Sequence, residues 1–197
     1  MPNIEVKGCA FHWTQAVWRK VQQLGLQTAY TDLVNCLINS YIRRLMALPF
    51  LPHETIKEMF EKLAESATTP VLQQLVMYIR TTWIENELWS PCSWSVFMLS
   101  VRTNKDVEGW HHALHRRANG RCALPLYVLL NFLHEEACLT TSRICLVSEK
   151  KWTQVQRKKY WLVQAKIFGL WDAFNKKEKT LEQLLKAASY LNRPTIR

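Results

Sequence analysis

The strongest candidates for a functional site lie in the stretch 102–111, which reads Arg-Thr-Asn-Lys-Asp-Val-Glu-Gly-Trp-His. An apolar run precedes it and an amphipathic segment follows it. This pattern predicts that Glu108 lies in the first turns of a helix whose N-cap is Thr103 or Asn104. A carboxylate there, beside Asn104 and His111, could hold a metal ion. The alternative is an ordinary first-turn acid that complements the helix dipole.

A second candidate pair is Cys9 and His12, three positions apart where a predicted strand passes into a predicted helix. A thiolate and an imidazole are typical zinc ligands, but a closed structural zinc site needs four. His111 and His115 could supply the other two, because residues four apart share a helix face. The alternative is that Cys9 is a small buried hydrophobe and His12 a hydrogen-bonding residue at a helix start.

Taken in order, these segments resemble the Mutator-like (MULE) transposases, and more closely the domain of invertebrate proteins that also carry FLYWCH zinc fingers. The likeness rests on Gly-Cys-Ala-Phe-His at 8–12, on Gln-Ala-Val-Trp-Arg-Lys at 15–20 and on the stretch 102–111. It extends over residues 2–192. The resemblance implies an RNase H-like Asp-Asp-Glu site that binds Mg²⁺ or Mn²⁺. In such a site, a helical insertion follows the Cys-x-x-His and Glu108 is the third carboxylate.

The sequence departs from this family at its first two carboxylates. The family's aspartates lie upstream of the Cys-x-x-His, and only eight residues precede Cys9 here. Cleavage by this class needs carboxylates that clamp two metal ions about 3.5–4 Å apart. Asp106 lies roughly 200° around a helix from Glu108, so the two do not converge. We therefore expect a truncated transposase domain that is inactive alone.

Composition indicates a folded protein of an intracellular compartment. Hydrophobic residues make up 48% of the 197 positions, and nine are Trp, which is enough to build a core. Six Cys occur without a Cys-x-x-Cys pair or a signal-peptide pattern, so reduced thiols are expected. The longest apolar stretch, residues 122–133, is too short to span a bilayer. We expect a soluble protein without a membrane partner and, if it is a transposase, a nuclear location.

The net charge of +10 is concentrated near the C-terminus. Residues 148–197 hold twelve Lys or Arg against four acids, which suits DNA as a partner. Cations alternate with aromatic residues there, and the candidate DNA-binding residues are Lys150, Lys151, Arg157, Lys158, Lys159 and Lys166. The alternative is a solvated helix face. A non-catalytic, domesticated DNA-binding module is therefore a competing function, as is a helical protein that binds an intact transposase copy or itself.

The periodicity predicts a mainly helical protein with about seven to eight helices and one short N-terminal strand at residues 4–11. Apolar stripes predict helices near residues 13–24, 33–48, 56–63, 70–83, 105–119, 126–137, 160–174 and 181–191. Residues 94–101 fit either a buried strand or a helical turn. We expect residues 1–147 to form the remnant of an RNase H-like core with its helical insertion. Residues 148–197 would then be a basic helical extension.

Overall fold

The computed structural model describes residues 7–32, 36–103, 105–121, 123–148 and 158–191, which form two compact units. The first unit comprises Met1–Thr103 and Leu162–Arg197, and the second comprises Asn104–Trp161. The sequence predicted one boundary, after residue 147. The structure instead groups the C-terminal helices with the N-terminal ones, in the first unit.

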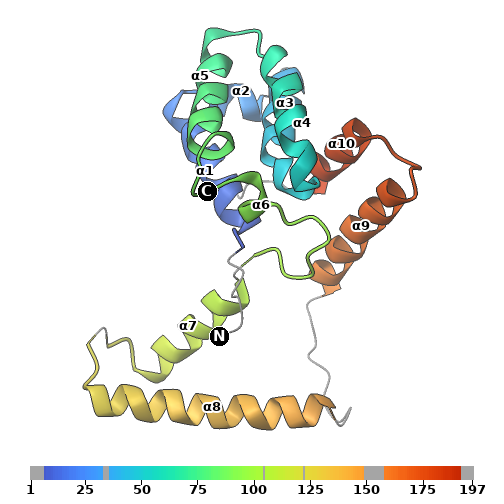
Figure 1. Cartoon of the computed structure of the whole chain (residues 1–197). Helices are drawn as coiled ribbons and strands as arrows, with labels where there is room; N and C mark the ends of the chain where they lie inside the picture. The colour runs from blue at the N-terminus through green and yellow to red at the C-terminus, as the bar shows by residue number, and fades with distance from the viewer. Residues whose placement is uncertain (1–6, 33–35, 104, 122, 149–157, 192–197) are drawn as a thin grey trace. The chain divides into compact units, whose positions relative to one another are not determined.

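The described residues are mainly helical, and none of them forms a β-strand. The elements of the first unit are α1 (Ala10–Gln23), α2 (Gln27–Thr31), α3 (Cys36–Met46), the 3₁₀ turn η1 (Leu48–Phe50), α4 (His53–Glu65), α5 (Pro70–Ile79), the π turn η2 (Arg80–Ile84), α6 (Pro91–Trp94), most of α9 (Lys158–Asn175) and α10 (Leu181–Leu191) (Figure 1). The second unit holds α7 (Lys105–Arg117) and α8 (Leu126–Ser148). The short helices α2 and α6 come in addition to the eight predicted. No helix in the described part of the chain has the length and apolar character needed to cross a membrane.

Local sequence signals set several helix ends. The Thr69 hydroxyl caps α5 by accepting a hydrogen bond from the Leu72 amide at 3.3 Å. At the start of α10, the Gln183 amide donates to Thr180 Oγ1 at 3.3 Å, and the Thr180 amide donates to Gln183 Oε1 at 3.0 Å. This reciprocal pair is a capping box, which the Thr-x-x-Gln pattern at 180–183 favours. Helix α1 ends before Gly25, which has a φ of +70°. Glycine adopts this left-handed conformation without strain.

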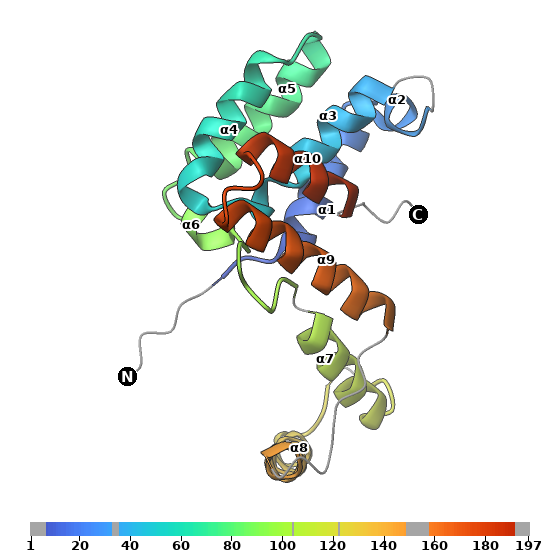
Figure 2. The same ribbon diagram turned by 90° about the vertical axis from the view of Figure 1, so that its right-hand side faces the viewer.

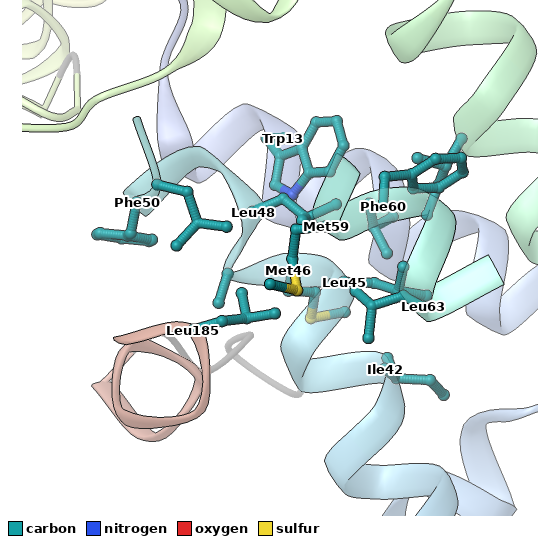
Figure 3. Close-up of a cluster of buried hydrophobic side chains, with 14 of the residues drawn as sticks. Trp13, Ile42, Leu45, Met46, Leu48, Phe50, Met59, Phe60, Leu63 and Leu185 are labelled. Atoms are coloured by element: carbon teal, nitrogen blue, oxygen red, sulfur yellow. The ribbon is translucent and has the colours of Figure 1, made fainter. Parts of the chain in front are cut away.

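The core of the first unit gathers side chains from helices that are distant in the sequence (Figure 3). Trp13, Met46, Met59 and Leu185 come from α1, α3, α4 and α10, and each is at most 2% exposed. Helix α10 lies against α3 (Figure 2), and it also contacts η1. Trp171 of α9 is fully buried, and its indole Nε1 donates to the Phe50 carbonyl at 2.8 Å. The C-terminal helices are therefore part of this core rather than an appended extension.

An aromatic cluster joins α1 to the segment before the 102–111 stretch. The rings of Trp13 and Trp94 stack with centroids 4.4 Å apart, and Trp83 meets Trp13 edge-on at 5.1 Å. Trp94 also donates its indole N–H to the Trp89 carbonyl at 2.9 Å. Offset and edge-on aromatic pairs stabilise beyond the area they bury. They hold the short helix α6 against the start of α1.

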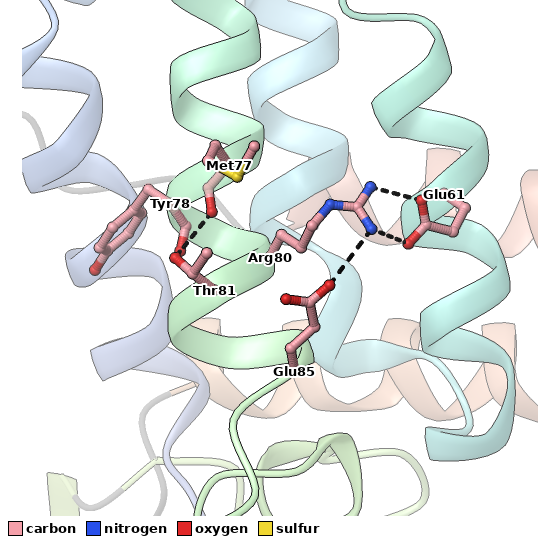
Figure 4. A network of polar contacts seen from close by, with 6 residues as sticks. All are labelled: Glu61, Met77, Tyr78, Arg80, Thr81 and Glu85. Atoms are coloured by element: carbon pink, nitrogen blue, oxygen red, sulfur yellow. Dashed lines mark hydrogen bonds and ion pairs between the residues drawn. The ribbon is translucent and has the colours of Figure 1, made fainter.

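A polar network links α4 to the end of α5 (Figure 4). Both terminal nitrogens of Arg80 bond the Glu61 carboxylate at 2.6 Å, and Nη1 lies 3.8 Å from Glu85 Oε1. The guanidinium also lies 5.2 Å from the centre of the Phe60 ring. The hydrogen bonds from Arg80 hold the pKa of Glu61 below its ordinary value. This bidentate pair fixes the spacing of the two helices where η2 begins.

The second unit contains α7 and α8, which are connected by an arginine near the end of α7. Asn119 and Gly120 both have positive φ, 52° and 71°, which ends α7 where the sequence predicted. Arg117 near the end of α7 bonds Glu136 at 2.7 Å and also bonds Glu135. Its guanidinium lies 5.7 Å from the centre of the Phe132 ring. One arginine thus clamps α7 to the middle of α8.

The strand predicted at residues 4–11 is wrong where the structure describes it. Residues 7–9 have no regular structure and helix α1 begins at Ala10, while residues 4–6 lie outside the described residues. The amides of Gly8 and Ala10 are bonded to carbonyls of Ser93 and Arg102, not to a strand ladder. Residues 95–101 are irregular too, so neither of the alternatives for residues 94–101 holds along its length.

Candidate functional site

The two segments that carry the family resemblance meet in the first unit. The Ala10 amide donates to the Arg102 carbonyl at 3.0 Å, although 92 positions separate the two residues. Ala10 is the first residue of α1, where the initial amides have no partner within the helix. The Arg102 carbonyl therefore satisfies an amide that α1 leaves open. As a result, the start of the Cys9–His12 segment lies beside the start of the stretch that leads into α7.

The residues before Cys9 complete the end of α6. The Gly8 amide donates to the Ser93 carbonyl at 2.6 Å, and Lys7 Nζ donates to the Cys92 carbonyl at 3.1 Å. Both carbonyls lie at the end of a one-turn helix, where intrahelical donors are lacking. A Cβ on Gly8 would lie 2.8 Å from the Trp94 Cβ and 3.0 Å from its Cα. Glycine is required here because the two backbones approach too closely for a side chain.

Arg102 is held by contacts that the sequence analysis did not predict. Its side chain is 7% exposed, and its Nη2 donates to Gln164 Oε1 on α9. Gln164 in turn donates to the Ser100 carbonyl at 2.9 Å, and the guanidinium lies 5.9 Å from the centre of the Phe50 ring. These contacts fix the chain two residues before Asn104. The only signal in the sequence was a cation at the end of an apolar run, and it did not identify Gln164.

Helix α7 carries Glu108, His111 and His115, and all three side chains are exposed. Their spacing of three and four places them along one side of the helix. Helix α7 begins at Lys105, and the predicted cap residue Asn104 lies outside the described residues. Glu108 thus lies in the first turn, as predicted. Its position fits both interpretations given from the sequence, a metal ligand and a first-turn acid.

Cys9 and His12 lie at the start of α1. Cys9 is the N-cap residue and is half-buried, whereas His12 is exposed and packs edge-on against Phe11 at 5.6 Å. They belong to the first unit, and His111 and His115 to the second. Across the described residues, no three His, Cys, Asp or Glu side chains are grouped so that they could hold a metal ion. The four-ligand zinc site stays a prediction.

Three of the six candidate DNA-binding residues lie in the part of the chain that the structure describes. Lys150, Lys151 and Arg157 are outside the described residues, and Lys158 and Lys159 form the first turn of α9. The Lys166 side chain is exposed, two positions beyond Gln164 on α9. The turn between α9 and α10 adds two exposed cations, Lys176 and Lys177, which were not among the predicted DNA-binding residues.

In comparisons with known proteins, no family model, no curated protein and no solved structure matches this chain significantly.

Proposed function

We propose that this chain is part of the catalytic domain of a MULE-type DNA transposase, in which Glu108 is the third carboxylate of the Asp-Asp-Glu site. The observation that supports the proposal best is the hydrogen bond from Ala10 to Arg102. It joins the Cys-x-x-His segment to the segment before Glu108, and these are the two motifs that carry the resemblance. A mainly helical stretch between them agrees with the helical insertion expected in that family.

The donor set on this chain does not fit the two-metal site that such a domain uses. That site requires several carboxylates around two ions, which together stabilise the attacking and the leaving oxygen. Among the described residues, no group of three or more possible ligands is present, and Glu108 alone occupies a family position. Mg²⁺ or Mn²⁺ would supply that chemistry in a complete site. We assign no cleavage step to these 197 residues by themselves.

The surrounding genome and transcript test this proposal. An open reading frame upstream of the Met1 codon should encode two aspartates at the ends of predicted strands, and terminal inverted repeats should flank the gene. Sequencing the locus and mapping the 5′ end of the transcript would reveal both features. If neither aspartate-bearing strands in any frame nor flanking repeats are present, the assignment to a transposase is wrong.

A second candidate function is DNA binding without catalysis, which the charge distribution favours. Twelve of the 26 Lys and Arg residues fall within positions 148–197, beside only four acids. Such a basic segment binds the phosphate backbone and releases counterions, so affinity falls steeply with salt. This function also implies a nuclear location. It requires no carboxylate cluster.

Salt dependence of duplex binding tests this second function. Reversing the charges at Arg157, Lys158 and Lys159 should flatten the plot of log affinity against log salt by up to about 0.9 for each phosphate contact removed. The control is Lys57→Glu, on an exposed position of α4 in an acidic segment, which should leave the slope unchanged. Fluorescence anisotropy with random-sequence duplex gives both slopes. Salt-independent binding, or none at low salt, would exclude this function.

A further inference from the structure

Helix α8 carries a histidine and a cysteine that neither proposed function uses. His134 and Cys138 are four positions apart, and the imidazole Nε2 lies 3.8 Å from the thiol Sγ. Residues at this spacing lie on the same side of a helix, one turn apart. Both residues are exposed, so an ion in solution can reach them directly. Imidazole nitrogen and thiolate sulfur are typical zinc ligands in proteins.

The distance between these two donor atoms fits the separation required around a tetrahedral zinc ion. Zinc binds sulfur at about 2.3 Å and nitrogen at about 2.0–2.1 Å. With a tetrahedral angle between the two bonds, the donor atoms lie about 3.6 Å apart, which is only about 0.2 Å less than their separation in this chain. The thiol and the imidazole can therefore receive one ion between them with little movement of either side chain.

The helix itself holds the two residues at this spacing. His134 and Cys138 lie in the interior of α8, a helix of 23 residues (Figure 1). The turn that follows His134 is also held by α7, because Arg117 bonds Glu136 at 2.7 Å and also bonds Glu135. Binding of an ion therefore has to order only two side chains on a backbone that is already regular. This limits the conformational entropy that binding loses.

We propose that His134 and Cys138 form a two-residue binding site for a thiophilic divalent cation such as Zn²⁺. The ion takes the place of the thiol proton, which passes to solvent, and it accepts the lone pair of His134 Nε2. The ring proton is then on Nδ1. The bound ion links two successive turns of α8. This site differs from the one predicted at Cys9 and His12, which belong to the first unit.

Two donors fill half of a tetrahedral coordination shell. Within the described ranges of the chain, no third His, Cys, Asp or Glu side chain is grouped with them as a metal ligand. The other two positions are therefore available to water or to a donor atom of a bound molecule. Open positions of this kind distinguish the proposed site from a closed structural zinc site, which uses four protein ligands.

Titration of the reduced full chain with Co²⁺ tests whether the thiolate binds the ion, because a bond between Co²⁺ and a thiolate gives a charge-transfer band in the near ultraviolet. The native chain should show this band, and Cys138→Ser should abolish it. The control is Cys92→Ser, which removes another exposed thiol whose neighbours four positions away, Leu88 and Val96, are not metal ligands. This control should keep the band. A native chain without the band, or a band that survives Cys138→Ser, would overturn the proposal.

The affinity for Zn²⁺, measured by competition with a chromophoric chelator, tests whether the histidine shares the ion. His134→Gln should weaken binding at least about tenfold, since even groups that only orient a metal ligand have effects of this size. Cys138→Ser should weaken it at least as much, and the double variant should add little, because both residues bind one ion. The control His53→Gln, at an exposed position of α4, should leave the affinity unchanged. Circular dichroism without metal checks that each variant keeps its helices. An affinity that His134→Gln leaves intact would overturn the proposal.

Discussion

Gly8 shows how one residue can decide whether two distant segments meet. Its amide is bonded to Ser93, and its α-carbon lies against the Trp94 backbone with no room for a methyl group. Trp94 in turn stacks on Trp13 at the centre of the aromatic cluster. A displacement at Gly8 therefore disturbs both the end of α6 and the packing of α1.

Gly8→Ala should lower the free energy of unfolding by about 1–3 kcal/mol, the usual cost of overpacking a tight contact. The control is Gly169→Ala, in the interior of α9, where a Cβ meets nothing within 4 Å. That change should raise stability by about 0.5–1 kcal/mol, because alanine favours the helix. Urea unfolding of both variants measures the difference. Equal effects of the same sign would contradict the close approach at Gly8.

The pair of Arg80 and Glu61 should make stability depend on acidity. The hydrogen bonds from Arg80 lower the pKa of Glu61 from its ordinary value of 4.5. The folded carboxyl holds its proton less tightly than the unfolded one. The stabilisation is therefore present above pH 4.5 and is lost as the pH falls through the lowered pKa.

Arg80→Met should consequently destabilise the chain near neutral pH, and this destabilisation should shrink progressively as the pH falls below 4.5. Arg80→Lys keeps the charge without the bidentate geometry and should retain part of the pH dependence. Urea unfolding across this range checks both variants. A difference between the native chain and Arg80→Met that stays constant with pH would show that the pair does not set this carboxyl's pKa.

At the scale of helices, short sequence signals proved sufficient wherever the partner was local. Thr180 and Gln183 form a capping box that follows the Thr-x-x-Gln pattern, and Thr69 caps the helix that begins at Pro70. The apolar stripes predicted where the longer helices lie, because the residues on the buried side of a helix recur at the helical period. These features depend on residues three or four positions apart, which a single sequence displays directly.

Features that depend on distant partners could not be predicted in the same way. The strand expected at residues 4–11 failed because the amides of Gly8 and Ala10 are satisfied by residues 93 and 102. Arg102 and Gln164 are 62 positions apart, and no local pattern pairs them. For the candidate site, the sequence did predict the first-turn position of Glu108. It could not provide the contacts that anchor the chain before that helix.

Thr180→Ala should cost about 0.5–2 kcal/mol of stability, because the first amides of α10 lose their side-chain acceptor. Thr180→Ser keeps the hydroxyl and should recover most of that loss. Helix α10 contributes Leu184 and Leu185 to the core, so the effect should appear in the main unfolding transition. If the serine variant is as unstable as the alanine variant, the hydroxyl is not the group that caps this helix.

At the scale of the whole chain, the C-terminal helices are built into the first unit. Leu185 and Trp171 are buried with residues of α1, α3 and η1. Part of the positive charge of residues 148–197 therefore lies on α9 and α10, which also contribute side chains to the core. The side chains of Lys166, Lys176 and Lys177 are exposed rather than packed in this core, so a polyanion could reach them.

The most direct test of the account is a metal-dependent cleavage assay on the purified 197-residue chain, run with Mg²⁺ and with Mn²⁺ beside Glu108→Gln. Because one carboxylate cannot position two metal ions, neither protein should nick or join duplex DNA above the level of a protein-free control. Cleavage by the native chain that disappears in Glu108→Gln would contradict the account, since these residues would then form a complete catalytic site.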